Sequence, residues 1–118
     1  MPEIKPPDFE DMLGMVEVIR KLNVEVQILR VDLDVAEAET VKKASMDKSL
    51  SNDGKYLSTT FINSTYKITG INGELIAKRR ELARLSAELD KAEKLFLVMK
   101  MQFEYWRTIQ ANERKSNF

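Results

Sequence analysis

Apolar residues recur along two long stretches of this chain at alternating steps of three and four residues. On an α-helix, this spacing places the apolar side chains along one continuous seam. The pattern therefore predicts two long coiled-coil helices that associate through their seams. The first seam is formed by Met12, Met15, Ile19, Leu22, Val26, Leu29, Leu33, Ala36 and Thr40, and the second by Ile71, Leu75, Leu82, Leu85, Leu89, Ala92, Phe96, Met99, Phe103 and Trp106.

A second apolar stripe follows the first stretch on roughly the opposite side of the helix. Parts of this stretch alternate between apolar and polar residues, which taken alone is typical of a strand. Helix is favoured because the seven-residue seam runs through the same residues without a turn. A helix that is apolar on two sides needs partners on both, so we expect a bundle made by several chains. The second stripe consists of Val24, Ile28, Val31, Val35 and Ala38.

Prolines, glycines and capping residues set the expected boundaries. The three prolines lie within residues 1–7, which we expect to form an extended arm, and Asp8 is placed to cap the helix that follows. The predicted elements are helix one at 8–49, a connector at 50–71, helix two at 72–113 and a frayed tail at 114–118. The connector is rich in Ser, Thr, Asn and Gly but also holds aromatic residues, so we expect it to be ordered, with a short helix near 55–63. Thr69 or Asn72 is the expected cap of helix two.

These observations predict an all-α fold in one domain, residues 1–118. The two long helices would form an antiparallel coiled-coil hairpin with an ordered polar connector, assembled as a homo-oligomeric bundle. Parallel pairing between copies is the alternative topology. The residues expected at the oligomer interface are Val24, Ile28, Val31, Val35, Leu82, Leu85, Leu89, Phe96, Phe103 and Trp106.

The composition argues against most kinds of chemistry. The chain has no cysteine and no histidine, which removes thiol nucleophiles, imidazole acid–base chemistry, disulfides and the commonest metal ligands. Its carboxylates lie on the flanks of the seams, where they face water or pair with Lys and Arg. We therefore expect no enzyme activity, no cofactor and no metal. No run of residues is long and apolar enough for a membrane span, so a cytoplasmic protein is expected.

Charge is distributed unevenly although the formal total is zero. Residues 1–54 carry 12 acidic and 7 basic side chains, and residues 55–118 carry 7 acidic and 12 basic ones. The plain interpretation is that the two helices attract each other when they pack. The other interpretation is a basic surface for nucleic acid, with aromatic side chains that stack on bases. Its candidate contacts are Lys78, Arg79, Arg80, Arg84, Tyr105, Arg107, Arg114 and Lys115.

The order of parts resembles a class of small phage-encoded helical proteins that includes single-strand recombination mediators. The resemblance rests on a long first helix, the connector pieces Gly54-Lys55 and 67–70, the charged segment 89–93 and the segment 105–114. It implies an oligomeric ring or bundle in a host cytoplasm that binds single-stranded DNA and a partner protein such as a recombinase, without catalysis of its own. Two alternatives stay open: a structural or adaptor coiled coil for virion or tail assembly, and a small helical regulator of another protein.

Overall fold

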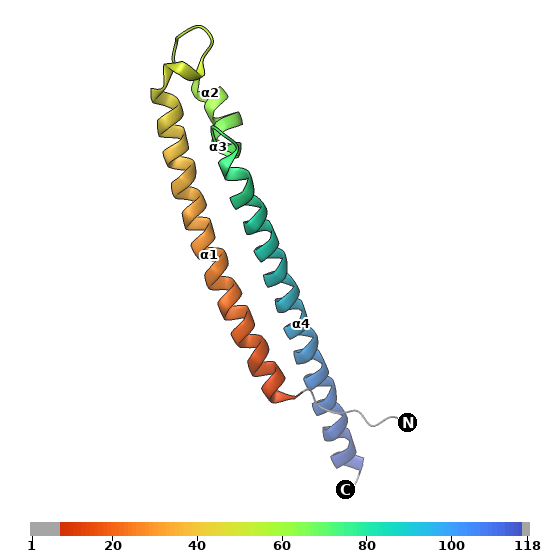
Figure 1. Ribbon diagram of the computed structural model, residues 1–118. Coiled ribbons are helices and arrows are strands. Elements are labelled where there is room, and N and C mark those ends of the chain that lie inside the picture. The colour runs from red at the N-terminus through yellow and green to blue at the C-terminus, as the bar shows by residue number, and fades with distance from the viewer. Residues whose placement is uncertain (1–7, 117–118) are drawn as a thin grey trace. The chain divides into compact units, whose positions relative to one another are not determined.

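The computed structural model of this protein describes residues 8–116, and every regular element in that range is helical. Two long helices, α1 (Phe9–Met46) and α4 (Glu74–Ser116), are joined by a shorter connector and form a helical hairpin (Figure 1). The predicted all-α hairpin is confirmed at this level. The expected arm at 1–7 and the last two residues of the expected tail lie outside the described residues.

The seam residues explain how the helices pair. Along α1 every predicted seam position is buried or half-buried, and the same holds for α4 from Leu75 onward. The seam spacing also falls on Lys78, a charged residue between Leu75 and Leu82, and this side chain is exposed. Thr40 is a polar seam residue that is only 6% exposed, and its hydroxyl donates to the Ala36 carbonyl at 2.8 Å. The hydrogen bond offsets the cost of burying that hydroxyl. One seam expectation is wrong, because Ile71 lies in the turn before α4.

The chain divides into two compact units, each holding part of both long helices. The first unit comprises residues 1–23 and 87–118. There Phe9 and Phe103 meet edge to face with ring centroids 5.4 Å apart, and Phe103 stacks on Trp106 at 6.0 Å. Ala92 is buried in this unit, at 5% exposure.

The second unit, residues 24–86, contains the connector and most of the fully buried residues. Its core is built by α1, by α4 and by one connector residue, Ile62, which is 2% exposed. Burial of these side chains supplies the main driving force for packing the helices together. The core side chains are those of Val26, Leu33, Ala44, Ile62, Leu75 and Leu85.

The connector is ordered, as expected, but its helix is displaced from the expected 55–63. A 3₁₀ turn, η1 (Lys48–Leu50), is capped by the Asp47 side chain, and the chain then forms α2 (Thr59–Phe61), a π-helical turn η2 (Ile62–Tyr66) and α3 (Lys67–Thr69). Ser58 caps α2, since its hydroxyl accepts the Phe61 N–H at 3.1 Å. The cap lies three residues after Lys55, which is why the helix begins late.

Asp8 caps the first long helix as expected, but the other ends of the long helices differ from the expected residues. Asp8 caps α1 by accepting the Glu10 N–H at 2.8 Å, and α1 ends at Met46 because Asp47 starts a new turn. Thr69 does not cap α4, since its hydroxyl donates to the Thr65 and Gly70 carbonyls. Instead, the Glu74 carboxylate accepts the N–H groups of Ile71 and Asn72. At the other end, α4 continues through residues 114–116, where fraying was expected.

Candidate interaction surfaces

An unpartnered apolar surface lies on the part of α1 that belongs to the second unit. We call it the α1 ridge, and it consists of Val24, Ile28, Val31 and Val35. Their exposed fractions are 46%, 57%, 60% and 52%, although all four are aliphatic. The steps of four, three and four residues place them in one line on the side of the helix away from its seam. The structure thus leaves this predicted second stripe open to solvent in the single chain.

The other residues expected at an oligomer interface lie in the seam that α4 shares with α1 of the same chain. Leu85 is 8% exposed, and the remaining five are half-buried. Phe103 and Trp106 stack on each other, which engages both rings within the first unit. Their burial is explained by the hairpin alone. These six are Leu82, Leu85, Leu89, Phe96, Phe103 and Trp106.

A second exposed apolar line, on α4 in the first unit, was not predicted as an interface. We call it the α4 ridge, and it consists of Leu97, Val98, Met101 and Tyr105, with exposed fractions of 53%, 49%, 63% and 59%. Val98, Met101 and Tyr105 follow steps of three and four residues outside the seam, and Leu97 lies four residues before Met101. Only Tyr105 was singled out as an exposed aromatic. Leu97, Val98 and Met101 could have been found in the sequence by searching α4 for a second apolar stripe, as was done for α1.

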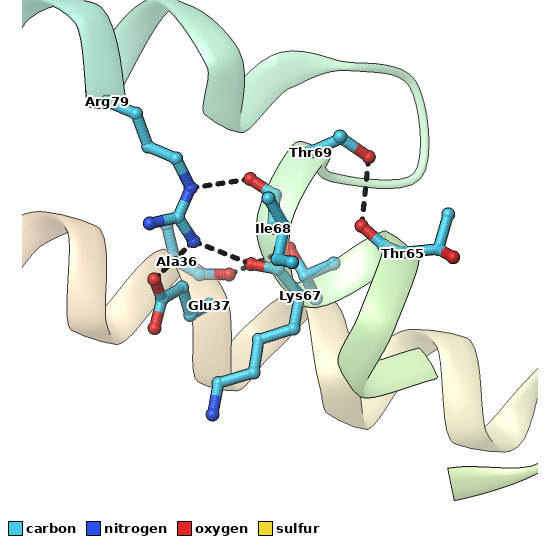
Figure 2. A network of polar contacts seen from close by, with 8 residues as sticks. Ala36, Glu37, Thr65, Lys67, Ile68, Thr69 and Arg79 are labelled. Atoms are coloured by element: carbon cyan, nitrogen blue, oxygen red, sulfur yellow. Dashed lines mark hydrogen bonds and ion pairs between the residues drawn. The ribbon is translucent and has the colours of Figure 1, made fainter. Parts of the chain in front are cut away.

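Arg79 is enclosed by a network that ties three elements of the second unit together (Figure 2). Its guanidinium donates to the carbonyl oxygens of Ile68 at 2.6 Å and Lys67 at 2.9 Å, and it also pairs with the Glu37 carboxylate. The two carbonyls belong to α3, whose C-terminal end favours a positive charge. Arg79 therefore bridges α4, α3 and α1, and these bonds engage donors that a phosphate contact would need.

The other predicted nucleic-acid contacts fall in different units. Lys78, Arg80 and Arg84 are exposed on α4 in the second unit, and Arg84 pairs with Glu81 three residues away. The remaining four, Tyr105, Arg107, Arg114 and Lys115, are exposed on the last turns of α4 in the first unit. There the side chains of Trp106, Arg107 and Arg114 line a shallow surface hollow.

Several carboxyl groups have a lowered pKa because they form exposed ion pairs or accept backbone N–H groups at the start of a helix. Hydrogen bonds with Arg20 and Arg84 lower the pKa of Glu17 and of Glu81, respectively, and backbone N–H groups lower the pKa of Glu74. Each shift favours the charged form that the contact needs. Within residues 8–116, no group of three or more acidic side chains is placed to hold a metal ion. None of the described helices combines the length and apolar character that a bilayer crossing requires.

No protein-family model, curated protein or solved structure matches this chain. The interpretation of its surfaces therefore rests on the geometry above.

Proposed function

We propose that this chain is a non-catalytic helical hairpin whose role is assembly, and that it works as a homo-oligomer. The observation that carries this proposal is the α1 ridge. Four aliphatic side chains, each about half exposed, form one line on a helix whose other side is already covered. Contiguous exposed apolar surface of this kind is typical of an interaction site. A coiled-coil partner laid along the ridge would remove it from water.

Solution mass tests the proposal directly. Light scattering and sedimentation over a range of protein concentrations should show a species larger than one chain that dissociates on dilution. Val31→Asp places a charge in the middle of the ridge and should shift the protein to monomer without loss of helical circular dichroism. Ala83→Asp is the matched control, because Ala83 is exposed on α4 outside both ridges. A wild-type protein that stays monomeric throughout the range would refute the proposal.

A second candidate is the binding of single-stranded nucleic acid by the end of α4, as the resemblance to recombination mediators implies. The observation in its favour is the surface hollow whose lining residues include Trp106, Arg107 and Arg114. Aromatic and Arg side chains together can stack on bases and neutralise phosphates. A partner protein such as a recombinase would then use other surfaces of the assembly.

Fluorescence anisotropy with a labelled single-stranded oligonucleotide tests this candidate. Binding should be strongest near about 50 mM salt and should fall as salt rises, because bound phosphates release counterions. Replacing Arg114 and Lys115 by Ala should weaken it, whereas Lys42→Ala should have little effect, since Lys42 is an exposed lysine of α1 outside this segment. No binding at low salt would exclude this role.

A further inference from the structure

The surroundings of the α1 ridge are acidic. Residues 21–38 extend from one helical turn before the ridge to one turn after it. They carry four acidic and two basic side chains, a net charge of −2. Glu25, Asp32 and Asp34 are all exposed beside the ridge residues. A partner that covers the ridge must bring its own flanks close to these carboxylates. A second acidic ridge would be repelled, and a basic one attracted.

The surroundings of the α4 ridge carry the opposite charge. Counted in the same way, residues 94–108 carry three basic and one acidic side chains, a net of +2. Lys100 is exposed, and its ammonium lies 5.6 Å from the centre of the Phe96 ring. Lys94 and Arg107 form exposed pairs with acids of their own helix, and the Arg107 guanidinium also lies 5.9 Å from the centre of the Phe103 ring. Such pairs exchange partners at little cost, so both cations can turn toward carboxylates of another chain.

The two ridges also match in length and shape. The first and last residues of the α1 ridge are 11 positions apart and those of the α4 ridge 8 positions apart, which on a helix is about 16 Å and about 12 Å. The α1 ridge presents only short, β-branched side chains, which are stiff. The α4 ridge presents longer ones, including Met101 and Tyr105, which can insert between them. Longer side chains of one helix that fill the spaces between short side chains of another are typical of knobs-into-holes packing.

We propose that the α1 ridge of one copy packs against the α4 ridge of a second copy. This inference rests on the proposed function and specifies which two surfaces come into contact. Because the two surfaces are different, the first contact leaves one copy with a free α4 ridge and the other copy with a free α1 ridge. These two remaining ridges can cover each other in a two-fold dimer, or they can pair with further copies in a ring or a filament.

Mixing two singly blocked variants tests this pairing. Val31→Asp blocks the α1 ridge and leaves the α4 ridge intact, and Met101→Asp does the reverse. Each change adds a carboxylate at an exposed position, so circular dichroism should match that of the wild-type chain. A buried unpaired charge should weaken the contact about a hundredfold or more, so each variant alone should be monomeric. A one-to-one mixture contains one intact pair of ridges and should form a heterodimer and nothing larger.

The outcomes separate this inference from the proposed function. A heterodimer in the mixture, measured by sedimentation, supports the pairing of unlike ridges. If Met101→Asp keeps the wild-type mass while Val31→Asp is monomeric, the chain self-associates through α1 alone and the inference fails although the proposed function stands. If wild-type protein is itself monomeric, both fail and the ridges serve a different partner. Ala83→Asp, which should keep the wild-type mass, controls for the added charge.

Discussion

At the scale of single residues, the structure gives Arg79 a different role from the nucleic-acid contact that the sequence suggested. In the sequence it is one of several adjacent basic residues, and nothing local distinguishes it from Arg80. In the structure Arg79 bridges Glu37 and the end of α3, whereas Arg80 is exposed and has no hydrogen bond or ion pair with the described part of the chain. The partners of Arg79 are 11 to 42 residues away in sequence, so no local pattern could have identified them.

Arg79→Ala should therefore destabilise the protein, while Arg80→Ala should not. The first change removes three polar contacts and leaves two α3 carbonyls without that donor, which should lower the free energy of unfolding by about 1–3 kcal/mol. Arg80→Ala should change it by less than about 0.5 kcal/mol. Urea denaturation followed by circular dichroism measures both. Equal stability of the two variants would contradict the network as the structural role of Arg79.

Gly70 is the connector residue at which a side chain is least tolerated. Its φ is +85°, and a Cβ atom there would lie 2.5–2.9 Å from the carboxyl group of Glu74, which accepts two backbone N–H groups. Gly70→Ala should cost about 2 kcal/mol or more, because backbone strain adds to loss of this capping contact. Gly54→Ala is the control: its φ is +70° but no atom lies near, so it should cost only about 1 kcal/mol. Thermal unfolding compares them.

At the scale of elements, the apolar pattern predicts the long helices but not the connector. A seven-residue repeat is carried by many residues, so a single exception such as Lys78 does not change the result. The connector depends on single hydrogen bonds, such as the Ser58 cap of α2, and on a π-helical turn that leaves no periodic signal. The same difference between a repeated pattern and single contacts explains which of the candidate sites could be predicted from the sequence. The α1 ridge could be predicted from spacing, whereas the Arg79 network required the tertiary structure.

Leu85 tests the seam at the level of the helix pair. It is 8% exposed, so Leu85→Asp buries a charge without a partner and should cost several kcal/mol. We expect loss of helical circular dichroism, or a lowering of the unfolding temperature by more than about 10 °C. Leu89→Asp should act in the same direction but less, since Leu89 is only half-buried. Unchanged spectra and unfolding temperatures for both variants would contradict the observed register.

The start of α4 should make stability depend on pH. Backbone N–H groups, that of Glu74 itself first and that of Asn72 next, lower the pKa of the Glu74 carboxyl group in the folded chain. A lowered folded pKa means that the contribution is present above the unfolded value of about 4.3 and is lost as the pH falls through the folded value. Between neutral pH and about pH 3, the unfolding temperature of Glu74→Gln should therefore fall less than that of wild type. Glu39→Gln, at an exposed position outside the surroundings of both ridges, is the matched control.

At the scale of the whole molecule, we propose that the same sequence serves two kinds of pairing, one within a chain and one between copies. The seams join α1 and α4 within one chain, and they draw on the larger and more regular set of apolar residues. The ridges are shorter and lie on the sides of the helices that the seams leave free. Neutral total charge hides the fact that the α1 ridge is surrounded by acids and the α4 ridge by bases. We therefore expect the two kinds of pairing to respond differently to salt.

Salt should weaken the association of copies and leave the hairpin itself almost unchanged. Unlike ridges attract through exposed charges, which sodium chloride screens, so the apparent dissociation constant should rise between about 50 mM and about 500 mM salt. The buried seam residues carry no charge, so helical circular dichroism should stay constant over that range. Sedimentation at several salt concentrations measures the first effect. If two α1 ridges paired instead, screening would relieve repulsion between their acidic flanks, and the association would become stronger as salt is added.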